Sequence, residues 1–256
     1  MVTRKSDIGL VVTDIDGTLV PIGTHVPSPA TRKAMHAMHD AGVYVAAATA
    51  RPYEAARALF LELGFTGPSV FDGGASIFDV GTSELLWKNW LSLSRLKTAA
   101  DILLPHAVTV DFFPEYKMLP AAEVNADALT EEAPYAWAMV RESAFDEVIK
   151  QLKQLPDLNV HPGVGKPDQP GLIDVQITDI NADKFHALTE LRKLLNVSKQ
   201  QTLAIGDSSN DIPLFDGAGL RIAMGNSIPE LKALADHEVS TVDEDGWAEA
   251  MNRFVL

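Results

Sequence analysis

Cysteine is absent from the 256-residue chain. Its absence excludes a disulfide, a thiolate nucleophile and a zinc site with cysteine ligands. It also favours a cytoplasmic location, although a secreted protein of this size can lack cysteine too. No apolar stretch approaches the roughly 18 consecutive residues of a membrane span. The run Ile8–Thr13 ends at Asp14, too soon for a signal peptide, which needs about 7–15 apolar residues. The run therefore predicts a buried strand.

Positive charge is scarce. The chain has 21 Lys and Arg against 35 Asp and Glu, a formal net charge of −14. Because binding to nucleic acid and to anionic membranes depends on basic residues, we expect neither as a partner. The net charge does not exclude a small anionic substrate, since a metal ion and a few cations can invert the local field. The apolar fraction of 46% is that of a globular protein with a real core.

Strand and helix patterns alternate at both ends of the chain. The predicted strands there are Ile8–Thr13, Val43–Thr49, Ser69–Phe71, Thr202–Gly206 and Leu220–Met224. The predicted helices are Ala30–Asp40, Tyr53–Leu63, Asp183–Leu195, Asp211–Asp216, Pro229–Ala235 and Trp247–Phe254. This alternation predicts an α/β fold with a Rossmann-like, doubly wound parallel sheet.

The middle of the chain has a different pattern. Short strands are predicted at Leu85–Trp90, Ala107–Phe113 and Leu172–Thr178, and helices at Leu93–Leu104 and Ala144–Leu155. Such a pattern favours an α+β module with an antiparallel sheet. We predict that residues 82–178 are a domain inserted between two halves of one core, residues 1–81 and 179–256.

The segment Asp14–Thr18 (DIDGT) directly follows the first buried strand. In doubly wound sheets, ligands bind outside the carboxyl ends of the strands. Asp14 and Asp16 can point into one crevice there, where two like charges favour a cation between them. Oxygen ligands at a strand end suit Mg²⁺. The alternative is a polar turn, with Asp at its start and Gly17 for positive φ.

A second polar segment, Gly206–Asp211 (GDSSND), also follows a buried strand. Asp207 lies at the carboxyl end, where it can complete a metal site. Asn210 and Asp211 begin the next helix, and N-capping is the alternative explanation for both.

Two further positions have the same placement. Thr49 and Arg51 follow the second strand, where a hydroxyl and backbone N–H groups can bind an anion; the alternative for Thr49 is a helix N-cap. Lys184 is near the start of a helix, where a cation is unfavourable to the helix dipole. The alternative for Lys184 is a solvated surface lysine.

Together these residues indicate metal-assisted phosphoryl transfer. Asp14 is the candidate nucleophile, forming an aspartyl-phosphate, and Asp16 the candidate acid and base. Mg²⁺ and Lys184 are expected to neutralise charge on the transferring group.

The chain resembles the phosphatases of the haloacid dehalogenase superfamily, Cof-like type IIB group. The four motifs occur in order: Asp14–Leu19, Thr49, Lys184 and Gly206–Asp211, and the likeness continues through Ile222–Ser227 and Glu244–Gly246. The resemblance implies a catalytic core and an inserted cap that carries specificity.

The resemblance also implies roles for single residues. Mg²⁺ would be held by the side chains of Asp14 and Asp207 and the backbone carbonyl of Asp16. The phosphate would be contacted by Thr49, Lys184 and Asn210. Asp211 and Arg51 are candidates for a supporting role beside these groups.

Two positions depart from the family pattern. Phe185 follows Lys184 where glycine is frequent, and Asp72 opens a turn that often begins with Asn. The sequence assigns no role to Asp72.

Tyr116, Lys117, Arg141 and His161 are the candidates for substrate recognition in the cap. The alternative for each is an ordinary packed or surface residue.

We expect a small phosphorylated metabolite, such as a sugar phosphate, as substrate. A phosphosugar mutase and a catalytically idle binding protein are the alternatives. A dehalogenase is disfavoured because such enzymes generally lack the second aspartate, Asp16. The sequence does not identify the substrate or the oligomeric state.

Overall fold

The structure is a computed structural model that describes residues 7–24, 26–165 and 169–256. It divides the chain into two compact units, one formed by Met1–Trp87 with Lys184–Leu256 and the other by Lys88–Asp183. The division falls later than the predicted boundaries after residues 81 and 178. The reason is that β5 (Leu85–Lys88) extends a sheet of the first unit, and β10 (Leu172–Asp179) belongs wholly to the sheet of the second.

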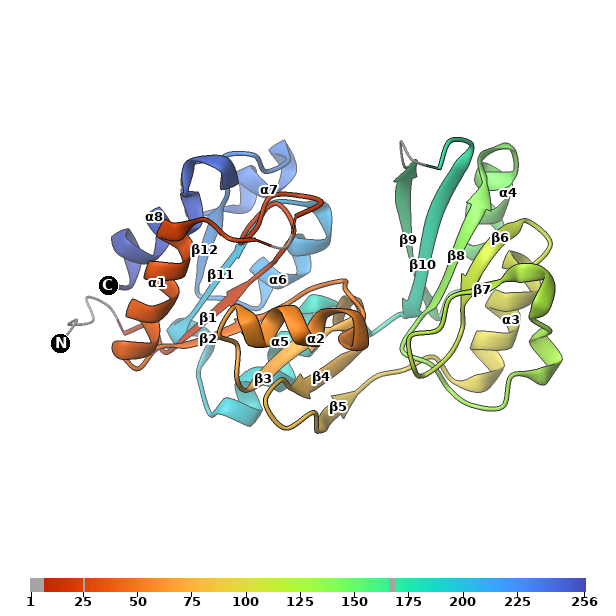
Figure 1. The fold of residues 1–256 in the computed structure, drawn as a ribbon, viewed down its shortest axis with the longest axis horizontal. Coiled ribbons are helices and arrows are strands. Elements are labelled where there is room, and N and C mark those ends of the chain that lie inside the picture. Colours follow the sequence, from red (N-terminus) through yellow and green to blue (C-terminus); the bar gives the residue numbers. More distant parts are fainter. Residues whose placement is uncertain (1–6, 25, 166–168) are drawn as a thin grey trace. The chain divides into compact units, whose positions relative to one another are not determined.

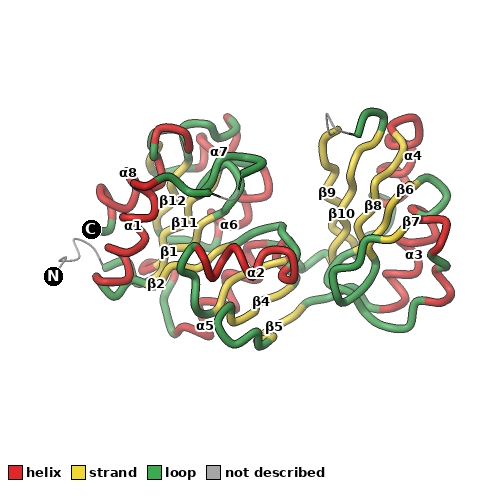
Figure 2. Tube along the Cα trace, viewed as in Figure 1, coloured by secondary structure: helices red, strands yellow, loops and turns green. Residues whose placement is uncertain are grey.

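A five-stranded parallel sheet lies at the centre of the first unit (Figures 1 and 2). Its order is β13-β12-β11-β1-β2. The strands are β1 (Leu10–Thr13), β2 (Tyr44–Ala47), β11 (Thr202–Gly206), β12 (Leu220–Ala223) and β13 (His237–Glu238). Thr13 pairs with Ile205 and Ala47, so the segments that follow β1, β2 and β11 leave the sheet at one edge. The predicted α/β fold with a parallel sheet is confirmed.

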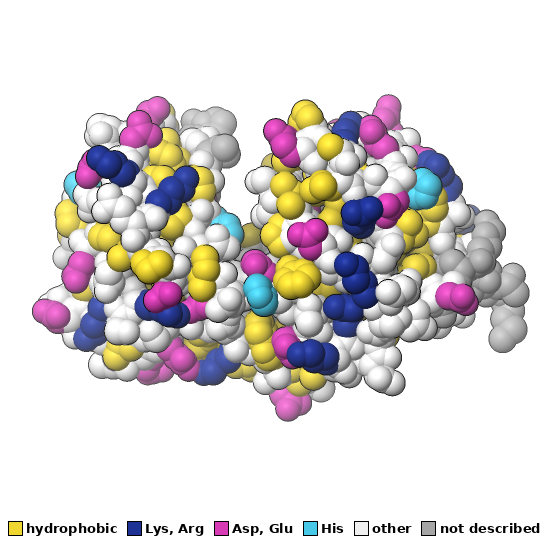
Figure 3. All heavy atoms as spheres, turned by 180° about the vertical axis from the view of Figure 1, so that it is seen from behind, with side chains coloured by type: hydrophobic (Ala, Val, Ile, Leu, Met, Phe, Trp, Pro, Cys, Tyr) yellow, Lys and Arg dark blue, Asp and Glu magenta, His cyan; other side chains and the backbone are white. Residues whose placement is uncertain are grey.

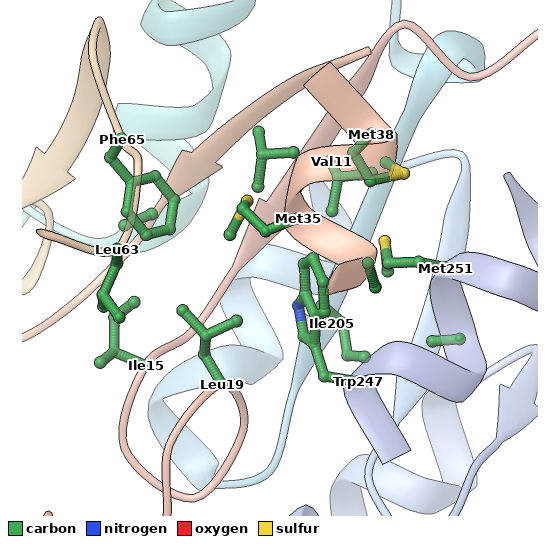
Figure 4. Close-up of a cluster of buried hydrophobic side chains, with 14 of the residues drawn as sticks. Val11, Ile15, Leu19, Met35, Met38, Leu63, Phe65, Ile205, Trp247 and Met251 are labelled. Carbon is green, nitrogen blue, oxygen red and sulfur yellow. The ribbon is translucent and has the colours of Figure 1, made fainter. Parts of the chain in front are cut away.

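Side chains of alternate residues on the sheet pack against helices on its two faces. Val11, Val45 and Ile205 belong to one cluster and Leu10, Val12, Ala46 and Ala204 to another, as the period of two in a strand requires. The first cluster includes α1 (Pro29–Asp40), α2 (Tyr53–Glu62) and α8 (Gly246–Phe254), and the second α5 (Lys184–Leu195), α6 (Ile212–Asp216) and α7 (Pro229–Leu234). Figure 4 shows Trp247 and Met251 of α8 beside Met35 and Met38 of α1.

The third strand differs from the prediction. β3 (Pro68–Phe71) starts an antiparallel sheet with β4 (Ser76–Asp79) and β5, instead of continuing the parallel sheet. One parallel bridge, Ala48 with Val70, joins it to the end of β2. The Ser69 hydroxyl oxygen accepts the N–H of Ala47 at 3.1 Å, where a ladder bond would otherwise form. A side chain thus replaces one backbone bond between the two segments.

The second unit is an antiparallel sheet of order β7-β6-β8-β10-β9, as predicted for the inserted module. Its strands are β6 (Ala107–Asp111), β7 (Leu119–Pro120), β8 (Ala136–Arg141), β9 (Leu158–Gly165) and β10. Helices α3 (Leu93–Leu103) and α4 (Glu142–Leu152) pack in one cluster with Val110, Ala138 and Val175 of the sheet.

Short 3-10 helices connect several of these elements. They lie at Asp72–Gly74, Ala121–Glu123, Ala126–Ala128, Lys199–Gln201, Ser209–Asp211 and Val242–Glu244. Across the described residues, we find no helix with the length and hydropathy to cross a membrane.

Candidate active site

Asp14 is held at the carboxyl end of β1 by backbone and side-chain bonds. Its N–H donates to the carbonyl of Ile205 at 3.0 Å, and its carbonyl accepts the Thr13 hydroxyl at 2.6 Å. The Thr13 oxygen in turn accepts the indole N–H of Trp247 at 3.1 Å. The Asp14 residue is 5% exposed, so the loop presents a carboxylate that is almost removed from solvent.

Lys184, the first residue of α5, reaches this carboxylate. Its side chain is 2% exposed, and Nζ lies 2.7 Å from Asp14 Oδ1 and 2.6 Å from Asp211 Oδ1. Nζ also lies 3.4 Å from Asn210 Oδ1. An ammonium has three donors; two make these short bonds, and the long contact with Asn210 leaves the third available to an anion. The sequence-based alternative of a surface lysine is wrong.

For both Lys184 and Asp14, burial and the charge of the partner residue shift the pKa in opposite directions. Burial lowers the pKa of Lys184, but the carboxylates of Asp14 and Asp211 outweigh it and hold the pKa above its ordinary value. Burial raises the pKa of Asp14 to about 8, with Lys184 acting in the opposite direction and Asp211 adding to the rise. The site thus concentrates carboxylates in a dry environment, where a cation is strongly favoured.

Asp207 lies beside the Asp14–Thr18 loop. Its Oδ1 accepts the Thr18 hydroxyl at 3.2 Å. Gly17 has φ +86°, and a Cβ on Gly17 would lie 2.3 Å from Asp207 Oδ2, so only glycine lets the loop approach this closely. Burial, with the neighbouring Asp211, raises the pKa of Asp207 to about 6.

Asp211 supports both neighbours instead of facing a ligand. Its Oδ2 accepts the N–H groups of Asp207 at 3.0 Å and Ser208 at 3.1 Å, and its Oδ1 accepts Lys184. The bond from Ser208 is half of a capping box in which Ser208 is the N-cap and Asp211 the third residue of the 3-10 helix. At the start of α6, where Asp211 is the N-cap, its side chain makes no cap bond, so the N-cap alternative does not hold for Asp211. Asn210 Oδ1 accepts the Ser208 hydroxyl at 2.8 Å, which leaves the amide N–H₂ to face an anion.

The carboxylate cluster fits a hard divalent cation. Oxygens of Asp14, Asp207 and Asp211 lie within 4.8 Å of one another. Since Asp211 already accepts three hydrogen bonds, Asp14 and Asp207 are the side chains best able to ligate. All-oxygen donors with room for water suit Mg²⁺.

Asp16 is paired with Arg51 and stands outside this cluster. Arg51 Nε donates to Asp16 Oδ2 at 2.8 Å and Nη2 to Oδ1 at 2.6 Å. Arg51 Nη2 also lies 3.4 Å from the carbonyl of Thr24. The Asp16 side chain is 38% exposed, so this carboxylate is open to solvent while Asp14 is not.

Thr49 is buried at the end of β2. Its hydroxyl oxygen accepts the N–H of Arg51 at 3.1 Å and keeps its own proton to donate. Its carbonyl accepts the N–H of Gly73 at 3.1 Å, and the Arg51 carbonyl accepts that of Asp72 at 3.1 Å. The turn after β3 thus fixes the loop that carries Thr49.

Asp72 gains a structural role here that the sequence did not assign. Its carboxylate accepts the N–H of Tyr53 at 3.3 Å, at the start of α2, where Pro52 supplies no side-chain cap. Asp72 has φ 56°, a conformation that Asp tolerates better than most residues. It acts as an N-cap from outside the helix.

The four candidate recognition residues lie in the second unit on three segments. Tyr116 and Lys117 are exposed in the β6–β7 loop, where the Tyr116 hydroxyl donates to Met118 Sδ at 2.9 Å and Lys117 Nζ lies 5.2 Å from the Phe113 ring centroid. Arg141 ends β8 and is exposed. His161 lies on β9, with Nε2 3.4 Å from the Thr178 hydroxyl. Their part in recognition stays a prediction.

Two contacts to the site come from segments without a sequence-based role. Trp247 reaches Asp14 through Thr13, and Asn226 donates to the Gly17 carbonyl. For Trp247 the sequence predicted only the start of a helix. Asn226 lies within the Ile222–Ser227 segment that resembled the family, and that likeness was the available signal.

Comparison with known proteins identifies the family. A model of haloacid dehalogenase-like hydrolases matches residues 11–134 and 125–251. A 5-amino-6-(5-phospho-D-ribitylamino)uracil phosphatase of Bacillus subtilis, YcsE, is 28% identical over 250 residues, 98% of this chain and 97% of that protein. A phosphoglycolate phosphatase of Metallosphaera sedula is 26% identical over 229 residues, 89% and 90% of the two chains.

The fold agrees with this assignment. The solved structure of a sugar phosphatase of haloacid dehalogenase subclass IIB superposes with a TM-score of 0.77 at 23% identity, covering 96% of this chain and 98% of that one. The chain belongs to the haloacid dehalogenase-like hydrolase family, and it is an enzyme of the phosphatase type, as its four motifs predicted.

Proposed function

We propose that the chain is a Mg²⁺-dependent phosphatase that hydrolyses a small phosphomonoester through an aspartyl-phosphate on Asp14. The observation that carries this proposal is the contact of Lys184 Nζ with Asp14 Oδ1 at 2.7 Å, both groups being buried. A fixed cation beside a buried carboxylate, at the carboxyl end of a parallel sheet, is suited to stabilise a transferring phosphoryl group.

In the first step, an Asp14 carboxylate oxygen attacks phosphorus and the bond to the ester oxygen breaks. Asp16 donates a proton to the leaving alkoxide. A carboxylate offers about four acceptor sites, so the two bonds from Arg51 leave room on Asp16 for that proton. Lys184, the Thr49 hydroxyl and the Asn210 amide bind the phosphoryl oxygens.

In the second step, Asp16 takes a proton from water, which attacks phosphorus. The phosphorus–oxygen bond to Asp14 breaks, inorganic phosphate leaves and the Asp14 carboxylate is restored. Bound by Asp14, Asp207 and the Asp16 carbonyl, Mg²⁺ would supply positive charge against the phosphoryl oxygens.

A sugar phosphate or a related metabolite is the substrate class that we propose. The two relatives above are named for small phosphorylated metabolites, a phosphoribitylamino-uracil and phosphoglycolate. On the face that Figure 3 shows, Lys and Arg side chains are interspersed with Asp and Glu, and the net charge is −14. Both features favour a small ester over a polyanion. The second unit is the proposed specificity domain, and a cytoplasmic location stays a prediction.

A panel of phosphate esters tests the function. The protein is incubated with sugar phosphates, phosphoglycolate and p-nitrophenyl phosphate, with Mg²⁺ or with EDTA, and inorganic phosphate is measured. We expect release with Mg²⁺ and none with EDTA. Failure to release phosphate from any ester contradicts the hydrolase, and interconversion of sugar phosphates without release identifies a mutase instead.

A further inference from the structure

We propose that Asn226 is a positioning residue that orients Asp207 and the Gly17 peptide group for cation binding. The proposal rests on the Mg²⁺ site of the proposed function. Asn226 belongs to the turn between β12 and α7, and no carboxylate of the cluster is close to it in sequence.

All three hydrogen-bonding functions of the Asn226 amide face neighbouring segments. Nδ2 donates to the Gly17 carbonyl at 2.8 Å and lies 3.4 Å from Asp207 Oδ2. Oδ1 accepts the N–H of Val242 at 2.9 Å. One side chain thus joins the Asp14–Thr18 loop, the end of β11 and the segment before α8.

These bonds define the direction of the Asp207 carboxylate. Thr18 donates to Oδ1 at 3.2 Å and Asn226 approaches Oδ2, so each oxygen has one donor. Since a carboxylate has about four acceptor sites, the remaining ones are held in a fixed orientation for a cation. Hydrogen bonds of this kind, one step removed from a metal, commonly govern its affinity.

The same amide acts on the peptide groups around Gly17. Gly17 N–H donates to the Val20 carbonyl at 2.8 Å, which orients the peptide group that carries the Asp16 carbonyl. Asn226 orients the next peptide group through the Gly17 carbonyl. Asn226 therefore contacts both the carboxylate ligand Asp207 and Gly17, the residue that directly follows the predicted backbone ligand.

The turn that carries Asn226 is fixed without its amide. Met224 N–H donates to the Gly206 carbonyl at 3.1 Å, and Ile228 N–H to the Asp207 carbonyl at 3.0 Å. The Ser227 hydroxyl donates to the Gly206 carbonyl at 3.1 Å. Removal of the amide should therefore disturb Asp207 and the Gly17 peptide group while the turn stays in place.

Calorimetric titration with Mg²⁺ at neutral pH tests the proposal. Wild type, Asn226→Ala, the similarly branched Asn226→Leu and the control Ser227→Ala are compared, and thermal unfolding without Mg²⁺ reports the fold. We expect both Asn226 variants to bind Mg²⁺ about 10–100-fold more weakly, with a melting temperature close to that of wild type. Ser227→Ala should bind within about twofold of wild type, since its hydroxyl bonds the Gly206 carbonyl and not Asp207, and the backbone bonds of Met224 and Ile228 still hold the turn.

Several outcomes overturn the proposal: unchanged Mg²⁺ affinity in the Asn226 variants, an equal loss in Ser227→Ala, or unfolding of the Asn226 variants without Mg²⁺. Absence of Mg²⁺ binding to wild type overturns it as well. Because the readout is binding, a wild type that binds Mg²⁺ but hydrolyses no ester contradicts the phosphatase and leaves the Asn226 result to be judged by itself.

Discussion

Arg51 and Asp16 form a two-bonded ion pair, with Nε to Oδ2 at 2.8 Å and Nη2 to Oδ1 at 2.6 Å. The planar guanidinium matches both carboxylate oxygens, a geometry that an ammonium cannot reproduce. The backbone N–H of the same Arg51 donates to the Thr49 hydroxyl oxygen. One residue thus links the proposed acid and base to the proposed phosphate-binding hydroxyl.

Arg51→Lys should lower kcat for p-nitrophenyl phosphate by about 100-fold, because a small misplacement of a catalytic group costs about that much. Arg221→Lys is the matched control, since Arg221 binds Asp236 with the same pattern, 3.0 Å and 2.6 Å, on the surface. It should retain the wild-type kcat. Equal kcat values for both variants would show that the two-bonded pairing of Arg51 with Asp16 has no catalytic consequence.

Lys184→Met should destabilise the fold strongly. It leaves the buried carboxylates of Asp14 and Asp211 without their cation, and breaking a buried pair typically costs about 3–5 kcal/mol. Lys193→Met is the control. It removes an ion pair with Glu190 whose lysine side chain is 66% exposed, so the free energy of unfolding should fall by less than about 1 kcal/mol. Urea unfolding without Mg²⁺ measures both. A Lys184 variant as stable as the Lys193 variant contradicts the buried contact.

Gly17→Ala and Gly23→Ala separate backbone strain from steric contact with Asp207. Both glycines have positive φ, +86° and +79°, but only at Gly17 would a Cβ meet Asp207 Oδ2, at 2.3 Å. We expect Gly17→Ala to weaken Mg²⁺ binding at least about 10-fold. Gly23→Ala should cost only about 1 kcal/mol of stability and keep the affinity. Calorimetric titration with Mg²⁺ measures both variants. Similar affinities would contradict the close approach of Gly17 to Asp207.

The buried carboxyl of Asp111, in the second unit, should make the stability of the protein depend on pH. Burial raises the pKa of its carboxyl above 3.8, and hydrogen bonds from Tyr135 and from the backbone of Lys117 and Phe113 offset this only in part. The Tyr135 hydroxyl donates to Oδ2 at 2.9 Å. The folded state therefore favours the protonated carboxyl, and its contribution to stability is largest below pH 3.8 and is lost as the pH rises through the raised pKa.

Asp111→Asn removes this titration. The free energy of unfolding of the variant relative to wild type should therefore increase as the pH rises over that window. Urea unfolding in a pH series measures it, with Asp101→Asn on the exposed side of α3 as control. A difference independent of pH would show that Asp111 does not titrate as described.

Most strands and helices of the first unit could be predicted from sequence because their cues are local; the short strands β4 and β13 were not. Apolar runs mark β1, β2 and β11, and Ser28, directly before Pro29, caps α1 by accepting the Thr31 N–H. Three strands of the second unit were missed, β7, β8 and β9, and β7 has only two residues. β8 presents alanines at 136 and 138 to its core, and alanine is a weak strand former. β9 contains Pro162 and two glycines, which are tolerated because β9 is at the sheet edge.

The candidate site was predictable only in part, for a physical reason. Parallel strand ends bring Asp14, Thr49 and Asp207 to one edge of a sheet, and that follows from the pattern of strands. The pairing of Arg51 with Asp16 and the bonds of Asn226 to Gly17 and Asp207 depend on side-chain packing between distant segments. No local pattern encodes that packing.

Trapping of the covalent intermediate tests the central claim most directly. The enzyme is mixed with p-nitrophenyl phosphate and Mg²⁺, quenched in acid and treated with borohydride, which reduces an aspartyl-phosphate to homoserine; the modified position is read by peptide mass spectrometry. The account predicts homoserine at position 14 in wild type, and none with EDTA or in Asp14→Asn. Homoserine at another aspartate, or none anywhere while phosphate is being released, would contradict it.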